Sequence, residues 1–473
     1  MSEERVLRNH WSVVASGTAR IAVVMAFVLV FILQTNGILY PETFAALYGT
    51  AVGTSLIVRI IIWKKTLYYF LEDEIIVRKT TIFRSETRIR YERLASVNVE
   101  RDFVCRLLGA TKLSFNLNSS VNAASAEAFI VLKNGEAEKL REEMEPLIFG
   151  RPAAAAEEET ESLVEVTLPD IILHSFIGMP TPQFGFGLVM LAYSVLSLAL
   201  GGGISIIAAL LFILDFFLPA ISSFFRLYGY RITRSGDTVS VSSGFFSTRN
   251  DSFLLSKVNF VKIREPLICR LAGKAILEVE VVGTANGKGV PLLCPLKSKA
   301  VAMDLFRTLL PEFECSGEAL KQPGSALAGI AVRISAVIAV SYAALAVAAA
   351  YYSDYIIWIC VAAAGIAALC AIWAILTYKV REFACDSDIA LIVAGSCDRV
   401  SNYILLDKIQ FADVRAGPLE RRFGTARCRL SLLSTAGAST VLSGVFPAEK
   451  LEAVSSEVLK RIEDGRYDFR RFQ

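Results

Sequence analysis

The sequence predicts an α+β multi-domain membrane protein with six transmembrane helices in three hairpins, each hairpin followed by a β-rich domain that ends in a helix. Two features predict this arrangement. Six apolar runs occur in pairs, and a similar stretch of sequence follows each pair. The composition agrees, because 54% of the residues are hydrophobic and only 20% are charged, whereas soluble domains carry about a quarter charged residues.

The apolar runs have the length of membrane spans. They cover Ala19–Leu33, Phe44–Trp63, Phe184–Leu200, Ile204–Phe225, Ile330–Ala350 and Tyr355–Thr377. Most are close to the ~20 residues that a helix needs to cross a bilayer. Core helices of a large soluble protein are the alternative, but six such runs paired by very short loops are hard to bury. No small-residue cleavage site follows the first run, so we expect a retained anchor and not a removed signal peptide.

Basic residues predict the orientation. They flank the open ends of the hairpins, at Arg5, Arg8, Arg20, Lys64, Lys65, Arg226, Arg231, Lys379 and Arg381. The hairpin tips contain no lysine or arginine. The positive-inside rule then places both termini and all three β-rich domains in the cytoplasm.

The repeated stretch runs over Tyr91–Leu113, Leu255–Leu277 and Leu406–Cys428, and the copies superpose without gaps. Each copy has a basic residue near its start, at the third position. Each also has an arginine later in the stretch, and a glycine follows three positions after that arginine. The sets are Arg93, Arg106 and Gly109; Lys257, Arg270 and Gly273; and Lys408, Arg421 and Gly424. Such a long period indicates one structural unit used three times. The glycine predicts a tight bend or a close strand approach. The arginine is expected to pair with an acidic neighbour inside its unit; an anionic headgroup or a partner's carboxylate is the alternative.

Each predicted domain is a series of strands followed by a helix. In the first, apolar residues alternate at Ile75 and Val77 and then take helical spacing at Leu140 and Met144. An alanine-rich acidic segment at 151–162 predicts a flexible linker. The predicted parts are 1–63 (N-terminus and first hairpin), 64–150 (first domain), 151–183 (linker), 184–225 (second hairpin), 226–316 (second domain), 326–377 (third hairpin) and 378–473 (third domain).

The sequence offers little for catalysis. Its two histidines, His10 and His174, are far apart and lie near the predicted membrane entry points, so histidine-based catalysis and zinc binding are not expected. The nine cysteines contain no Cys-x-x-Cys pair and are expected to be reduced, buried thiols. We therefore expect no enzyme, no catalytic residue, no cofactor and no metal.

Charged residues suggest two candidate sites. Residues 226–325 carry 14 lysines and arginines against nine acidic residues, and the basic set Lys257, Lys262, Arg264 and Lys274 is a candidate for anionic lipid or a partner. A solvated strand face is the alternative, and we expect Lys262 and Arg264 to face solvent. Asp215, inside the fourth apolar run, is a possible intramembrane functional residue. Arg59 and Arg333 lie near helix ends, where snorkelling suffices. A net charge of +3 gives no support to nucleic-acid binding.

The third copy, LDKIQFADVRAGPLERRFG at Leu406–Gly424, resembles the signature of bacterial pleckstrin-homology-like membrane proteins of the YdbS/YdbT type. Three hairpin-plus-domain units resemble the longer YdbT-like members. The first copy departs from the pattern, with Asp102-Phe103 in place of the proline–leucine pair, which puts one shared contact there in doubt. The resemblance implies pleckstrin-homology-like (PH-like) domains and a bacterial inner-membrane location, and it implies no catalytic residues.

The function expected from these features is that of a membrane scaffold or adaptor. Three tethered PH-like domains raise one another's effective concentration for a shared protein or lipid target, with envelope maintenance or stress resistance as the setting. The alternative is a transporter or lipid-handling protein that uses the helix bundle and Asp215. The sequence names no protein partner.

Overall fold

The computed structural model describes residues 5–36, 41–81, 84–91, 94–117, 128–149, 161–199, 206–281, 292–351, 356–434 and 437–465. These residues form two compact units. The first contains the chain up to Glu165 together with Phe225–Lys257; the second contains Val166–Phe224, Val258–Val281 and the chain from Leu292 onward. Arg93, most of the acidic linker (150–160) and the C-terminal tail from residue 466 lie outside the described residues.

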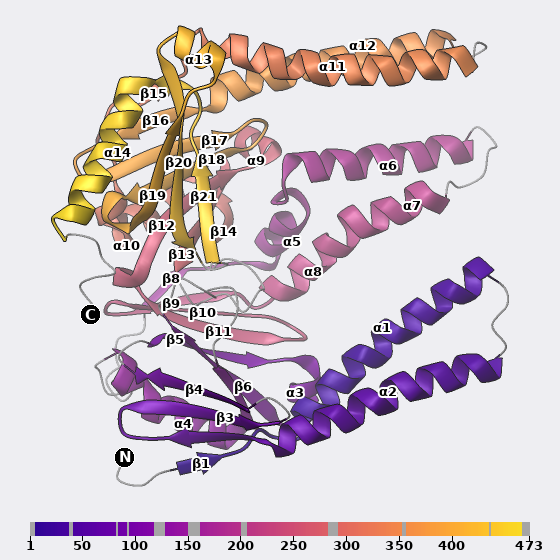
Figure 1. The fold of residues 1–473 in the computed structure, drawn as a ribbon, viewed down its shortest axis with the longest axis vertical. Helices are drawn as coiled ribbons and strands as arrows, with labels where there is room; N and C mark the ends of the chain where they lie inside the picture. The colour runs from indigo at the N-terminus through magenta and orange to yellow at the C-terminus, as the bar shows by residue number, and fades with distance from the viewer. Residues whose placement is uncertain are drawn as a thin grey trace. The chain divides into compact units, whose positions relative to one another are not determined.

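The apolar runs form helical hairpins (Figure 1). The helices are α1 (Ser12–Asn36), α2 (Pro41–Lys64), α6 (Thr181–Ala199), α7 (Ile206–Phe212), the π-helix η3 (Ile213–Phe217), α8 (Leu218–Leu227), α11 (Ala326–Tyr351) and α12 (Ile356–Val380). Five helical spans within the described residues are long and apolar enough to cross a membrane, when α7, η3 and α8 are counted as one span. In α1, the stretch Ser12–Ala26 is a shorter apolar helix and is not one of the five. Membrane association is thus supported, and the sixth span stays a prediction.

The first repeat is a β-sandwich closed by a helix. Its strands are β1 (Arg5–Leu7), β2 (Thr66–Phe70), β3 (Glu74–Thr80), β4 (Arg84–Arg90), β5 (Leu94–Arg101), β6 (Ala110–Leu117) and β7 (Ala128–Lys133), with the short helix α3 (Phe103–Leu107) and the closing helix α4 (Asn134–Phe149). Phe70, Phe115 and Leu140 meet in one buried core. Ile75 and Val77 of β3 are buried as the sequence predicted, but Ile76 between them is buried too, so this strand does not alternate there. The helical spacing of Leu140 and Met144 turns that face of α4 inward.

The second repeat begins earlier than expected, because part of the predicted linker 151–183 is regular structure. Its elements are β8 (Glu161–Val164), α5 (Leu168–Ile177), β9 (Arg231–Ser235), β10 (Thr238–Ser243), β11 (Thr248–Leu254), η4 (Leu255–Lys257), β12 (Val258–Glu265), α9 (Leu267–Leu271), β13 (Lys274–Val281), β14 (Leu292–Ser298), α10 (Lys299–Leu309) and η5 (Pro311–Phe313). Helix α5 starts at a capping box, in which Asp170 Oδ2 accepts the Thr167 backbone N–H at 3.0 Å.

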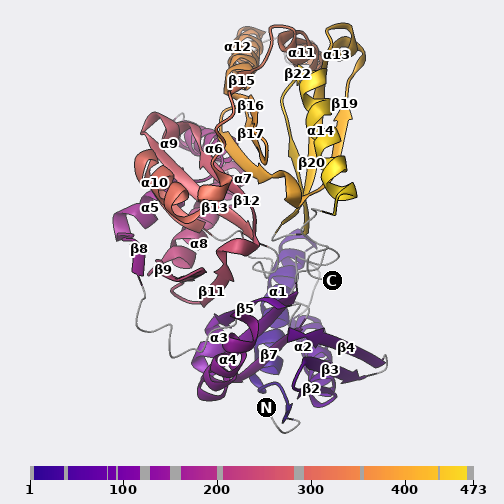
Figure 2. The same cartoon turned by 90° about the vertical axis from the view of Figure 1, so that its left-hand side faces the viewer.

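The third repeat shows the same order of elements. They are β15 (Leu320–Lys321), β16 (Glu382–Cys385), β17 (Ile389–Gly395), β18 (Arg399–Leu405), η7 (Leu406–Lys408), β19 (Ile409–Arg415), α13 (Pro418–Arg422), β20 (Thr425–Ser434), β21 (Gly437–Leu442), β22 (Phe446–Pro447) and α14 (Ala448–Glu463). Helix α14 packs along the sheet of β19 and β20 (Figure 2). Leu451, Val454 and Val458 of α14 lie in the same buried core as Leu430 and Phe446.

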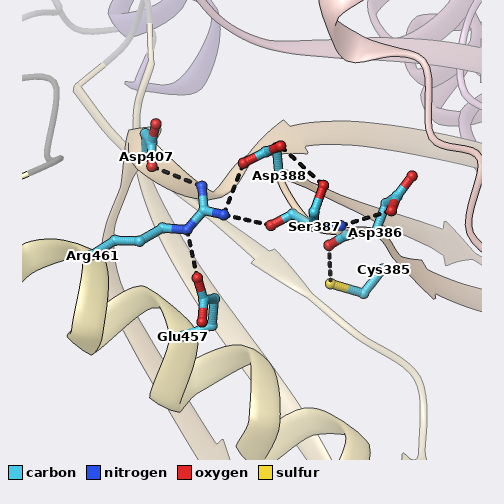
Figure 3. A network of polar contacts seen from close by, with 7 residues as sticks. All are labelled: Cys385, Asp386, Ser387, Asp388, Asp407, Glu457 and Arg461. Atoms are coloured by element: carbon cyan, nitrogen blue, oxygen red, sulfur yellow. Dashed lines mark hydrogen bonds and ion pairs between the residues drawn. The ribbon is translucent and has the colours of Figure 1, made fainter.

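A buried arginine fixes α14 to the strands (Figure 3). Arg461 donates from Nη1 to Asp407 Oδ1 at 2.9 Å, from Nη2 to Asp388 Oδ1 at 2.8 Å and from Nε to Glu457 Oε1 at 3.0 Å. It also donates to the backbone carbonyl of Ser387. One side chain therefore ties the closing helix to the β16–β17 turn and to η7.

The sheets do not follow the repeat boundaries. One seven-stranded sheet has the order β7-β6-β5-β11-β10-β9-β8, and the other has the order β14-β13-β12-β18-β17-β16-β15. In each, the fifth strand of one repeat (β5 or β12) pairs antiparallel with the fourth strand of the next repeat (β11 or β18). Successive repeats are therefore joined through shared sheets.

A polar side chain before each hairpin accepts a backbone N–H from the last strand of its domain or, for Gln322, from the residue just before that strand. Asn9 Oδ1 accepts the Val131 N–H at 2.8 Å. His174 Nδ1 accepts the Leu296 N–H at 3.2 Å, and Gln322 Oε1 accepts the Val445 N–H at 3.1 Å. All three side chains are buried. This contact gives His174 a structural role, and the sequence did not predict it because three different residue types make it.

Candidate functional site

The second compact unit contains a cavity of about 920 Å³ beside the base of the third hairpin. Strands β17, β18, β19, β20 and β21 and helix α11 contribute to its walls. Its charged lining residues are the cations Lys262, Arg333, Arg381, Arg415, Arg427 and Arg429 and the anions Asp413 and Glu420. With six cations against two anions, this space, called the basic cavity below, favours an anionic occupant.

Two arginines come from the hairpin itself. Arg333 is an exposed residue in the first part of α11, and Arg381 directly follows α12. Burial and the nearby positive charge of Arg333 lower the pKa of Arg381. Arg381 Nε donates to the backbone carbonyl of Gly395 at 3.1 Å, which fixes the side chain but does not neutralise it. The protein thus holds two repelling cations together at the end of the hairpin.

Both acidic side chains of the basic cavity are already paired. Asp413 Oδ2 lies 2.5 Å from Arg415 Nε, and Glu420 Oε1 lies 2.6 Å from Arg427 Nη2. Lys262 is paired with Glu280. Among the described residues, no carboxylate lies within ion-pair distance of three other cations of the cavity: Arg333, Arg381 and Arg429. Their positive charge is the part that a bound anion would neutralise.

Apolar residues share the lining. Gly329 and Val332 of α11 line the cavity, together with Leu419 and Leu442. The side chains of Val332, Leu419 and Leu442 are exposed. A wall that combines uncompensated arginines with apolar groups beside a membrane-length helix suits an amphiphile with an anionic head.

The basic residues singled out in the sequence lie differently from the expectation. Lys262 and Arg264 do not face solvent freely: their side chains are 22% and 27% exposed and are paired with Glu280 and Glu278. These carboxylates stand on the neighbouring strand β13, directly opposite β12, so cross-strand pairing explains the difference. Of the expected set, only Lys262 lines the basic cavity.

Lys257 and Lys274 are both half-buried. Lys257 ends η4 in the first compact unit, and Lys274 begins β13 in the second. Their proposed binding of lipid or of a partner stays a prediction.

The repeated arginine is directed towards the following repeat. Arg106 Nη1 donates to the backbone carbonyl of Phe245 at 2.7 Å, in the turn between β10 and β11. The positive charge of Arg270 acts on the Cys397 thiol, in the corresponding turn between β17 and β18. Arg421 lies in the third repeat, and its Nε donates to the Ala416 carbonyl of the same repeat at 3.1 Å. These contacts differ from the acidic partner that the sequence suggested.

The repeated glycines end the short helices α3, α9 and α13. Gly109, Gly273 and Gly424 have φ values of 64°, 64° and 63°. This left-handed conformation is the usual helix C-terminus that glycine adopts without strain. The tight bend expected from the sequence is therefore a helix cap, and the chain turns there directly into β6, β13 or β20.

Asp215 lies in the π-helical turn η3. Pro219 has no N–H, so it cannot make the α-helical bond to the carbonyl of Asp215, four residues earlier. Gln183 Nε2 donates to this carbonyl at 2.6 Å. Within the described residues the carboxylate atom Oδ2 has no hydrogen-bond partner, so the backbone of this turn is explained and the carboxylate is not.

Cysteine and metal chemistry add nothing to the site. All nine cysteines are free thiols, and burial raises the pKa of Cys269 to about 11 and that of Cys428 to about 12. Such thiols are poor nucleophiles. In the parts of the chain that the structure describes, no group of three or more His, Cys, Asp or Glu side chains is placed to hold a metal ion.

Comparison with known families agrees with the repeat. A family model described as the bacterial PH domain matches residues 19–148, 184–312 and 326–464. The chain belongs to the bacterial PH domain family. Each match takes in one hairpin and the domain after it, which agrees with the three-unit architecture of the resemblance drawn from the sequence. Searches of curated proteins and of solved structures found no match.

Sequence reasoning missed the basic cavity. It treated Arg333 as a snorkelling residue and did not consider Arg381, Arg427 or Arg429 as binding residues. The sequence did offer one signal, because Arg381 directly follows the third hairpin and was already used to orient the helices.

Proposed function

We propose that this membrane-associated PH-domain protein is an integral membrane scaffold that binds an anionic phospholipid headgroup in the basic cavity of its third repeat. The three PH-like domains would be held at the cytoplasmic face of the membrane by their hairpins. The observation that carries the proposal is the set Arg333, Arg381 and Arg429, which line one cavity at the base of α11 and have no carboxylate partner among the described residues.

The energetics favour a lipid over a free anion. A basic residue near an anionic membrane surface contributes about 1 kcal/mol, so three uncompensated arginines supply about 3 kcal/mol. The apolar wall around Val332 and Leu442 adds burial of the acyl chains nearest the headgroup, at about 25 cal/mol per Å². Inorganic phosphate would gain only the first contribution.

The proposal includes no catalytic step. The arginines of the cavity supply positive charge, and burial raises the pKa of Cys428, the one cysteine among the lining residues, so its thiol is a poor nucleophile. Binding without turnover is the role that these side chains support, in keeping with an adaptor.

Isothermal titration of the purified full-length chain in mild non-ionic detergent tests this function. Short-chain phosphatidylglycerol should bind, while short-chain phosphatidylcholine and inorganic phosphate should bind at least tenfold more weakly. The double variant Arg333→Gln/Arg429→Gln removes two charges, about 2 kcal/mol, and should weaken phosphatidylglycerol binding roughly 30-fold. Equal affinity for the anionic and the zwitterionic lipid would refute the proposal.

A matched control uses cations of the same unit that do not line the cavity. Lys450 and Lys460 are exposed on α14, and Lys450→Gln/Lys460→Gln changes the net charge by the same amount. This control should bind phosphatidylglycerol like the unmodified chain. If it weakens binding as much as the arginine variant, overall charge and not the cavity explains the affinity.

A second candidate function rests on Asp215. Its Oδ2 atom has no hydrogen-bond partner in the described residues and lies in a π-helical turn of a membrane-length helix, as a transport or lipid-handling site would require. Asp215→Asn should leave phosphatidylglycerol binding unchanged if the scaffold proposal holds. Loss of a cellular phenotype in this variant, with normal membrane insertion, would favour the transport reading.

A further inference from the structure

The two junctions between repeats use one register. In the first, Arg101 of β5 lies opposite Thr248 of β11. In the second, Glu265 of β12 lies opposite Arg399 of β18. The gapless superposition of the repeats makes Arg101 equivalent to Glu265 and Thr248 equivalent to Arg399. The same pair of strands therefore meets at the same residues twice, which is a built interface and not an accident of packing.

A third junction of this kind is left open at the two ends of the array. The fourth strand of the first repeat, β4, ends the sheet β1-β2-β3-β4, and the fifth strand of the third repeat, β19, ends the sheet β19-β20-β21. In the described residues, neither strand has a neighbour on its outer side. Such edges offer unpaired backbone N–H and carbonyl groups to another strand.

The side chains of β19 are those of a junction strand. Phe260 of β12 is fully buried in the core of the third repeat, opposite Ile404 of β18. The equivalent residue of β19 is Phe411, which is 58% exposed. A phenylalanine that fills a neighbouring core in one repeat stands uncovered in the next, because no strand of the described residues pairs with the outer side of β19.

The outer strand of the first repeat shows the complementary exposure. Arg84, Ser85, Glu86 and Arg88 of β4 are exposed, whereas most residues of the paired strands β11 and β18 are buried or half-buried. Ile89 of β4 is equivalent to Ile404 of β18, and both are fully buried on the inner face. Strand β4 thus has the buried inner residue of a junction strand, but in the described residues no neighbouring strand pairs with its outer side.

We infer that β19 of one copy of this chain pairs antiparallel with β4 of a second copy, in the register of the two internal junctions. Phe411 then lies opposite Ile89, as Phe260 lies opposite Ile404. Asp413 lies opposite Thr87 and Arg415 opposite Ser85, so no like charges face each other. The contact is head-to-tail, so it builds closed rings or open filaments instead of symmetric dimers. This inference rests on strand register and not on the lipid proposal, although Asp413 and Arg415 of β19 also line the basic cavity.

Photo-crosslinking of the full-length chain tests the pairing. Benzoylphenylalanine replaces Phe411, which keeps an aromatic group at an exposed position, and the protein is irradiated in mild detergent or in native membranes. We expect covalent dimers and larger species whose linked peptide contains residues 84–90. Mixing two differently tagged forms shows that the link joins separate copies. The same group at Leu459, exposed on α14, should give no such link.

A second measurement keeps the inference testable if crosslinking yields are low. Phe411→Glu places a carboxylate at the edge and should weaken self-association at least tenfold in native mass spectrometry, with an unchanged melting temperature. A link from position 411 to residues 84–90 of the same chain would overturn the inference, since it shows closure within one molecule. Links to other segments, equal oligomers from position 459, or a monomer at all concentrations would overturn it as well.

Discussion

Arg461→Met should release the closing helix α14 of the third repeat. The methionine keeps the apolar stem of the side chain but removes the guanidinium, which is 8% exposed and contacts three carboxylates and one carbonyl (Figure 3). The carboxylates of Asp388, Asp407 and Glu457 are 67%, 37% and 41% exposed. Because water screens them, each pair contributes about 0.5–1 kcal/mol. With about 1 kcal/mol for the carbonyl hydrogen bond, the total is roughly 3 kcal/mol.

Hydrogen exchange measures this loss at the helix itself. Peptides covering Ala448–Glu463 should exchange roughly 100-fold faster in the variant, since 1.4 kcal/mol corresponds to a factor of ten. Peptides from the equivalent helix α4 serve as an internal reference and should not change. Lys460→Met, at an exposed neighbouring position, is the matched control. An acceleration below fivefold in α14, or an equal acceleration in α4, would refute the reasoning.

Three further predictions concern unfolding of the full-length chain. Burial raises the pKa of Asp251 to about 6 against the charge of Arg249, so the stabilising contribution of this group is present below its unfolded pKa near 3.9 and is lost as the pH rises through about 6. Asp251→Asn places the residue of the equivalent position, Asn402, in the second repeat. This variant should add about 2–3 kcal/mol to the free energy of unfolding at pH 7.5 in denaturant titration, and it should flatten the pH dependence of stability between pH 4 and 6. Gly273→Ala should lower the free energy of unfolding by about 1–2 kcal/mol, because a φ of 64° strains any residue with a side chain, although no atom lies within 4 Å of the added Cβ. Gly273→Asn should lower it less, because asparagine tolerates this backbone conformation better than alanine. Gln322→Leu should cost about 1–3 kcal/mol by leaving the buried Val445 N–H without its acceptor, a loss that calorimetry would detect. A stability loss in Asp251→Asn, equal costs for the two Gly273 variants or an unchanged Gln322→Leu would each contradict its explanation.

The sequence predicted the parts of this protein whose signals are local. The apolar runs produced hairpins because their length and lack of charge allow little else. Alternation at Ile75 and helical spacing at Leu140 and Met144 predicted a strand and a helix that the structure contains. The three-fold repeat predicted three copies of one domain, and the family matches confirm it.

The pairing between repeats could not be predicted in this way. Each repeat supplies a fourth and a fifth strand, and nothing in their alternation distinguishes pairing within a repeat from pairing with the next one. The exposed Phe411 and the buried Phe260 look identical in the aligned sequence. Their difference depends on whether a strand of another repeat pairs with the outer side of β12 or β19, which is a property of the assembled sheets and not of the segment.

The candidate site was hidden for a related reason. Arg333, Arg381 and Arg429 are separated by long stretches of chain, and their meeting depends on how α11, α12 and β20 pack. Lys262 and Arg264 attracted attention because they are close together in the sequence. The structure pairs them with Glu280 and Glu278 on the neighbouring strand, a partner choice that only the strand register fixes.

Native mass spectrometry of lipids retained by the purified chain tests the central claim most directly. The protein is released from bacterial membranes in mild detergent, and the bound lipids are identified by mass for the unmodified chain, for Arg333→Gln/Arg429→Gln and for Lys450→Gln/Lys460→Gln. Our account predicts that an anionic phospholipid stays bound to the unmodified chain and to the lysine control and is lost from the arginine variant. Retention of zwitterionic lipid in equal amount, or an anionic lipid that persists in the arginine variant, would contradict it.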